Sequence, residues 1–100
     1  MKAKIVKIGF WLYDNLVEKP VDVIALDYDY WYKLYEADGF LDPGDEPEKM
    51  GPEGKLYYVR FQSALEKDLR FSPDSQGFQT IEKAMLAAEA KVTGKINWQH

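Results

Sequence analysis

The sequence predicts an α+β fold for residues 1–100, arranged as a single domain. We expect an antiparallel meander sheet of about three to five strands, one C-terminal helix packed on a sheet face, and a short final strand. Period-two alternation of apolar and polar residues over several amino-terminal segments indicates the strands, and one later stripe with helical period indicates the helix. The length of 100 residues and the hydrophobic share of 46% are those of one ordinary globular domain.

Three segments are expected to be long strands, namely residues 2–13, 21–36 and 55–62. The second contains Asp-Tyr-Asp-Tyr-Trp-Tyr-Lys-Leu-Tyr, residues 27–35, which continues the period-two pattern of the apolar run before it. Residues 14–20 are expected to form a loop between the first two strands. Asp14-Asn15 is a turn signal, and Pro20 interrupts a strand because it lacks a backbone N–H.

Residues 80–93 are expected to form the helix, and residues 95–98 the short final strand. Thr80 is suited to the N-cap, and Gly94 stands where a C-terminal glycine cap belongs. One stripe at helical spacing should face the sheet: Ile81, Ala84, Met85, Ala88 and Val92. We expect this helix to cover the sheet face formed by Val6, Ile8, Phe10, Leu12, Ile24, Leu26, Tyr28, Tyr30 and Tyr32.

Two connections are less regular. Residues 38–54 are dense in glycine, proline and acidic residues, so we expect an acidic loop without helix or strand. Residues 63–78 fit either a short helix capped by Ser63 or a turn followed by a short strand, and spacing does not decide between the two.

The segment Gly77-Phe-Gln-Thr-Ile-Glu-Lys-Ala-Met-Leu-Ala-Ala-Glu-Ala, followed by Gly94-Lys-Ile-Asn-Trp, resembles the closing helix and strand of many small bacterial and phage-borne sheet proteins. The resemblance concerns architecture and implies no activity.

An aromatic patch with a polar rim is the candidate functional feature, and its residues are Trp11, Tyr13, Asp27, Asp29, Trp31 and Tyr35. If the helix covers the opposite face, these side chains lie on the outward face of the hairpin, and such patches mark partner surfaces. Two structural alternatives remain: aromatic pairs across strands can simply stabilise a sheet, or the helix or long loop can cover this face. We expect a non-catalytic protein-interaction module whose partner is a protein, either a second copy of the chain or an unidentified one.

Two other functions fit the same residues. The chain could be an acidic inhibitor or immunity-type protein that binds a basic partner through Asp27, Asp29 and residues 38–54. It could also be a small carboxylate-dependent enzyme or a carbohydrate binder, with Trp31 and Tyr35 as a stacking platform. The second reading requires a concave site.

The composition excludes several classes of function. Zero cysteines and a single histidine, His100, give no support to thiolate zinc sites or to cysteine and serine triads, so no catalytic activity, cofactor or metal is expected. The net charge of −4 without a basic run disfavours nucleic acid and membrane surfaces as partners. No apolar run approaches the roughly 20 residues of a membrane helix, and the amino terminus lacks a signal-peptide pattern, so the expected location is cytoplasmic.

Overall fold

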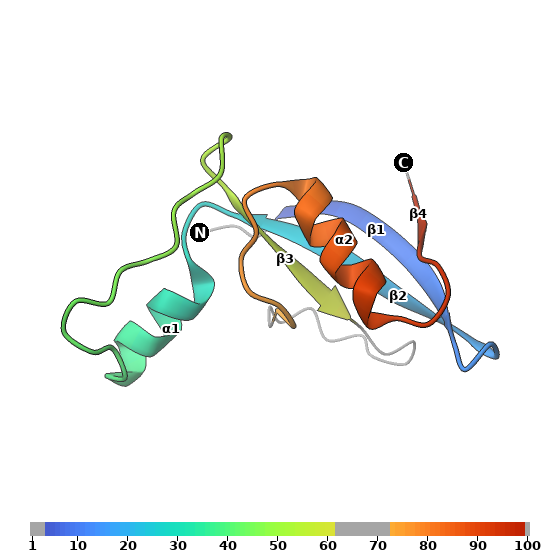
Figure 1. The fold of residues 1–100 in the computed structure, drawn as a ribbon, viewed down its shortest axis with the longest axis horizontal. Helices are drawn as coiled ribbons and strands as arrows, with labels where there is room; N and C mark the ends of the chain where they lie inside the picture. Colours follow the sequence, from blue (N-terminus) through green and yellow to red (C-terminus); the bar gives the residue numbers. More distant parts are fainter. Residues whose placement is uncertain (1–3, 62–72, 100) are drawn as a thin grey trace.

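The computed structural model describes residues 4–61 and 73–99 (Figure 1). In chain order its elements are β1 (Lys4–Tyr13), β2 (Val17–Leu26), α1 (Tyr30–Asp38), β3 (Leu56–Phe61), α2 (Ile81–Lys91) and β4 (Asn97–Trp98). The strands in this part of the chain form one antiparallel sheet in the order β3-β2-β1-β4. The predicted α+β fold, with a C-terminal helix on the sheet and a short final strand, is confirmed.

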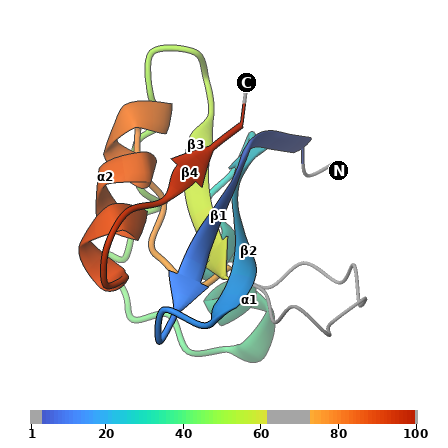
Figure 2. The ribbon, with the colours of Figure 1, turned by 90° about the vertical axis from the view of Figure 1, so that its right-hand side faces the viewer.

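Helix α2 lies along one face of the sheet, as the edge-on view of Figure 2 shows. Its Ala84 and Ala88 are fully buried, and their small side chains let the helix approach the strands closely. The buried residues packed around them are Val21, Val23, Ala25, Tyr57, Val59 and Ile96. The helix begins as predicted, because the Thr80 hydroxyl accepts a hydrogen bond from the Lys83 N–H at 3.1 Å.

The prediction of which face this helix covers is wrong, although Val6, beside the register shift in β1, does pack against the core that contains Ala84 and Ala88. Helix α2 packs against the face that carries Val21, Val23 and the half-buried Trp11, whereas Ile8 and Leu12 on the opposite face are 43% and 50% exposed. All six residues from Val21 to Leu26 are buried, so β2 is covered on both faces. An apolar run of this kind carries no alternation that could select the face for the helix.

The prediction that residues 21–36 form one strand is wrong after Leu26, where the strand ends. Asp29 is the N-cap of α1, and its side chain accepts a hydrogen bond from the Tyr32 N–H at 3.3 Å. Gly39, with a φ of 75°, ends the helix in the left-handed conformation that glycine tolerates best. These two signals outweigh the strand preference of the intervening aromatic residues, which depends strongly on context.

The connection between the first two strands is shorter than predicted. Asp14 and Asn15 both have positive φ, 54° and 57°, and the Leu16 N–H donates to the Tyr13 carbonyl at 3.0 Å, which makes a tight turn. Pro20 therefore lies within β2, opposite Phe10. The backbone N–H and C=O of Phe10 point toward β4 and not toward Pro20. The missing N–H of Pro20 therefore costs no hydrogen bond between β1 and β2.

The carboxyl-terminal elements are shorter than predicted. Val92, in an extended conformation, is the C-cap of α2, and Gly94, with a φ of 83°, lies in the turn that follows. The predicted glycine cap is therefore wrong. The final strand comprises Asn97–Trp98 rather than all of residues 95–98.

The long connection between α1 and β3 contains no helix or strand from residue 39 to residue 55, as predicted for the acidic loop, while Asp38 ends α1. Of the ambiguous segment 63–78, residues 63–72 lie outside the described residues. Residues 73–78 run along the outer edge of β3, where the Asp74 N–H donates to the Val59 carbonyl at 2.8 Å and Tyr57 exchanges two hydrogen bonds with Phe78.

Gly9 determines how closely β4 can approach β1. A Cβ atom at this position would lie 2.6 Å from Ile96 Cγ2 and 2.8 Å from Trp98 Cε3. We therefore expect Gly9→Val to lower the free energy of unfolding by about 1–3 kcal/mol, because overpacking would push β4 away from the sheet. Hydrogen exchange should report it directly, since the Gln99 N–H, which donates to the Ile8 carbonyl at 2.7 Å, should lose protection. Unchanged protection would contradict this role of Gly9.

Candidate interaction surface

The structure distributes the six predicted site residues over different elements. Trp11 and Tyr13 lie on β1, while Trp31 and Tyr35 lie one helical turn apart on α1. Asp27 and Asp29 lie between β2 and α1. The single outward face of a hairpin that was predicted to carry all six is therefore not formed.

The two carboxylates have different surroundings and do not form the side-by-side pair that a strand would present. Asp27 is exposed, whereas Asp29 is half-buried as the N-cap of α1. Its second oxygen accepts a hydrogen bond from the Glu48 N–H at 2.8 Å, and the Tyr58 hydroxyl lies 3.4 Å from its first. Asp29 thus holds the start of α1, the acidic loop and the sheet together, which is a structural role.

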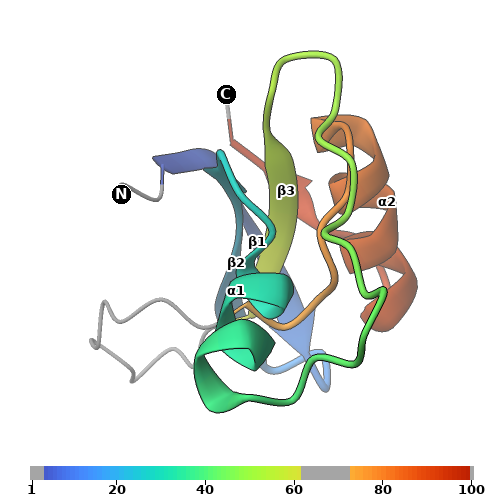
Figure 3. The ribbon, with the colours of Figure 1, turned by 90° about the vertical axis from the view of Figure 1, so that its left-hand side faces the viewer.

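The aromatic residues of α1 form the wall of a hollow. The Trp31 indole N–H donates to the Ser75 carbonyl at 2.8 Å, and Tyr30 packs edge-to-face on Trp31 with ring centroids 5.0 Å apart. Tyr35, 46% exposed, continues the wall toward solvent. The hollow, of about 450 Å³, is lined by Trp31, Tyr35, Pro73, Asp74, Ser75, Gln76 and Lys91. Figure 3 shows the segment after residue 73 passing between α1 and α2.

The aromatic residues of β1 line a second hollow. Trp11 and Tyr13 pack edge-to-face with centroids 5.8 Å apart, and Lys19 Nζ lies 4.0 Å from the centroid of the Tyr13 ring. Both the ring contact and the cation–π contact hold Tyr13, which remains 51% exposed, in one orientation. The hollow, of about 430 Å³, is lined by Trp11, Tyr13, Asp14, Lys91 and Thr93.

Lys91, the last residue of α2, lines both hollows. Its Nζ donates to the Asp74 carbonyl at 3.2 Å, and the residue is exposed. We call the group formed by Trp11, Tyr13, Trp31, Tyr35 and Lys91 the Lys91 surface. No pattern in the sequence pointed to this role for Lys91, because a lysine in the last turn of a helix is already explained by the helix dipole.

A buried ion pair lies on the sheet face opposite α2 and was not predicted. Arg60 Nη2 is 2.7 Å from Asp22 Oδ2, and Arg60 Nε is 3.1 Å from Asp22 Oδ1. The two side chains are 10% and 4% exposed. The sequence signal for this ion pair is Asp22, the one acidic residue within the apolar run from Val21 to Leu26. A charged residue is seldom buried without a partner, so a buried Asp22 implies a nearby cation.

Three tyrosines among the described residues have clearly shifted pKa values. Burial raises the pKa of the Tyr28, Tyr57 and Tyr58 phenols, so they remain protonated and are poor nucleophiles or bases at neutral pH. Within residues 4–61 and 73–99, no group of three or more His, Cys, Asp or Glu side chains is arranged to hold a metal ion.

Comparison with protein-family models, with curated proteins and with solved structures finds no match to this chain. None of the helices in the described part of the chain has the length and apolar character needed to cross a membrane. What the Lys91 surface does must therefore be inferred from its own residues.

Proposed function

We propose that this chain is a non-catalytic protein-interaction module that binds its partner through the Lys91 surface. The observation that carries the proposal is that aromatic pairs from β1 and α1, far apart in sequence, line two hollows that share Lys91. Tryptophan and tyrosine dominate the energetics of protein interfaces, because a large ring buries much apolar area at a small cost in side-chain entropy.

Self-association is the first form of the proposal to test. Tyr35→Ala removes an exposed ring of the Lys91 surface, and Phe40→Ala is the matched control because Phe40 is 73% exposed and lies outside it. In sedimentation over a concentration series, we expect Tyr35→Ala to weaken dimerisation about 30-fold, as for an interface hot spot of about 2 kcal/mol. Phe40→Ala should leave dimerisation unchanged. Acrylamide quenching of tryptophan should fall as the mass of the wild type rises.

If sedimentation shows a monomer at every concentration, the Lys91 surface is tested next for binding to a different protein. A photo-crosslinking residue placed at position 35 or at position 40 would then be irradiated in an extract of the source cells. The proposal expects a crosslinked protein from position 35 and not from position 40. Absence of self-association together with equal or absent crosslinking at both positions would overturn it.

A carbohydrate is a second candidate ligand, favoured by one observation. The shallow hollow beside Trp31 and Tyr35 carries Asp74, Gln76 and Lys91, which supply hydrogen-bonding groups next to the rings. A glycan array decides this alternative: binding that is lost in Tyr35→Ala and kept in Phe40→Ala supports it, and an array without binding rejects it.

A cytoplasmic location remains part of the proposal, because a chain with zero cysteines suits a reducing compartment. Fractionation of the source cells tests it, and recovery in an exported fraction would contradict it.

A further inference from the structure

The hairpin of β1 and β2 extends beyond the other strands at its turn (Figure 1). Strand β3 pairs with β2 only from Val21 to Leu26, and β4 pairs with β1 only at Gly9 and Phe10. Residues 11–20, which we call the hairpin arm, therefore pair as strands only with each other among the described residues. An isolated two-stranded ribbon is marginally stable in water, so an arm of this kind gains stability from a surface that packs against it.

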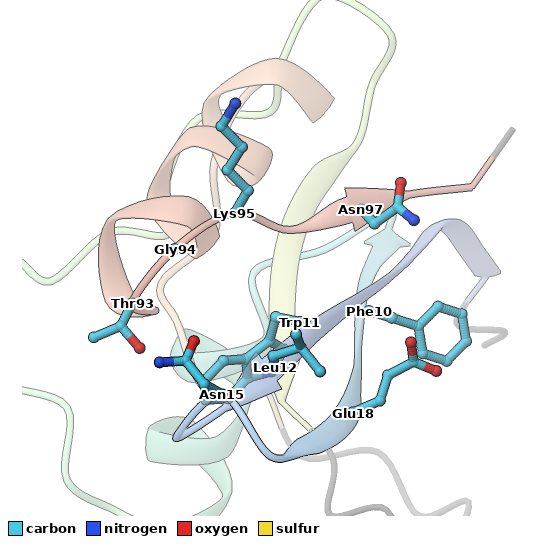
Figure 4. A pocket seen from close by; sticks show the side chains of 9 residues that line it. All are labelled: Phe10, Trp11, Leu12, Asn15, Glu18, Thr93, Gly94, Lys95 and Asn97. Atoms are coloured by element: carbon cyan, nitrogen blue, oxygen red, sulfur yellow. The ribbon is translucent and has the colours of Figure 1, made fainter.

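The end of the arm exposes apolar side chains. Leu16 is 80% exposed, and Leu12, Tyr13 and Val17 are each about half exposed. Leu16 lies in the turn itself, a position at which glycine, asparagine, aspartate and serine are the usual residues. Figure 4 shows the turn residue Asn15 near Thr93, which places the end of the arm beside the C-terminal end of α2.

A recess of about 250 Å³ adjoins the same end of α2. It is lined by three apolar side chains and three polar ones: Val59, Phe78, Ala87, Ser75, Gln76 and Lys91. Lys91 Nζ donates to the Asp74 carbonyl at 3.2 Å, so the ammonium group lies beside the segment that forms one wall of the recess. The recess is large enough for one leucine side chain, because a cavity of about 150 Å³ holds a benzene molecule.

We propose that the hairpin arm of a second copy of this chain docks on the Lys91 surface, with Leu16 in this recess and Asp14 beside Lys91. The inference rests on the self-association form of the proposed function and names the contact that forms the dimer. The recess shares Ser75, Gln76 and Lys91 with the hollow beside Trp31, so it is continuous with the Lys91 surface.

Charge complementarity selects a second copy as the occupant. Asp14 and Lys91 line one hollow, yet no ion pair joins them in the described part of the chain, so both charges are available to another molecule. The carboxylate of Asp74, the other acid beside Lys91, already accepts the Phe61 N–H at 2.7 Å. A surface that carries both an acidic apolar arm and a basic apolar recess can pair with its own copy about a two-fold axis, which forms the contact twice.

Sedimentation over a concentration series tests the anchor. Leu16→Ala should weaken dimerisation about 100-fold, or about 10-fold for each of the two contacts, because each loses apolar area that Leu16 buries. Leu86→Ala is the matched control, since Leu86 is 66% exposed on α2 and lies outside the recess, and it should change nothing. Asp14→Asn keeps a residue that tolerates the positive φ of this position, and it should weaken dimerisation about 5-fold.

Mixing two variants tests whether the arm and the recess belong to different molecules. Ala87→Phe fills the recess, so it should weaken its own dimer about as much as Leu16→Ala does. In the mixture, the intact arm of the Ala87→Phe variant meets the intact recess of the Leu16→Ala variant, which restores one of the two contacts. The mixed dimer should therefore form about 10-fold more tightly than either homodimer. If Ala87→Phe does not fold, Lys91→Glu at an exposed position replaces it.

Three results would overturn the inference: a wild type that stays monomeric, a dimer that Leu16→Ala leaves unchanged, or a mixture no tighter than its components. These failures are distinct from failure of the proposed function. A monomeric wild type leaves binding of a different protein by the Lys91 surface to be tested. A dimer that Tyr35→Ala weakens and Leu16→Ala does not retains the Lys91 surface and rejects the docking of the arm.

Discussion

Replacing Asp22 by alanine is expected to lower the free energy of unfolding by about 3–5 kcal/mol. The substitution removes the carboxylate that holds the Arg60 guanidinium at 2.7 Å and 3.1 Å, while the guanidinium remains largely buried with a side-chain exposure of 10%. A charge that loses a close counter-charge inside a protein costs far more than an exposed pair contributes. Urea denaturation of the wild type and the variant measures the difference.

A control variant distinguishes the effect of breaking the ion pair from the effect of removing any acidic residue. Glu46→Ala removes an exposed acid and should change stability by no more than about 0.5 kcal/mol. The double variant Asp22→Leu with Arg60→Met should recover most of the loss, because apolar side chains of similar size need no counter-charge. If the double variant is less stable than Asp22→Ala alone, the buried charge of Arg60 is not the cause.

Replacing Tyr58 by phenylalanine is expected to cost about 1–3 kcal/mol at neutral pH and to flatten the stability profile above pH 10. The Tyr58 ring is fully buried, and its hydroxyl accepts the Tyr30 N–H at 2.8 Å, at the first residue of α1. Loss of the hydroxyl removes that acceptor and weakens the attachment of α1 to the sheet. Circular dichroism and urea denaturation at pH 7 give the magnitude.

The pH dependence follows from the direction of the Tyr58 pKa. Burial, with a further contribution from Asp29, raises this pKa above the ordinary value of 10.0. Above pH 10 the unfolded chain loses the phenolic proton that the folded chain retains, so fewer protons are bound in the unfolded state and stability falls as pH rises. The contribution of Tyr58 is complete below pH 10 and is lost through the folded pKa, with a slope of up to about 1.4 kcal/mol per pH unit.

Denaturation from pH 8 to pH 11.5 tests this directly. The wild type should lose stability more steeply than Tyr58→Phe, and a residual slope should remain because burial also raises the pKa of Tyr28 and Tyr57. Parallel profiles for the two proteins would contradict the assignment.

Sequence patterns predicted an element correctly where all of the residues that form the pattern lie within that element. The Thr80 cap with the alanine stripe predicted α2, and the density of glycine and proline predicted the irregular segment before β3. The end of β2 was not predicted, because Asp29 fits the pattern of a polar strand residue as well as that of a helix N-cap. Only the structure distinguishes the two roles, since it shows the Asp29 carboxylate accepting hydrogen bonds from the Tyr32 and Glu48 N–H groups.

The sequence by itself determined the fold class, the C-terminal helix and the aromatic character of the candidate surface, because these depend on periodicity, caps and composition within short segments. Tertiary structure alone decided which face α2 covers, how Asp22 meets Arg60, and how Trp11, Tyr13, Trp31 and Tyr35 come to line hollows that share Lys91. The physical reason is that residues 21–26 of β2 are buried on both faces, so the side of the helix is set by the packing of distant segments.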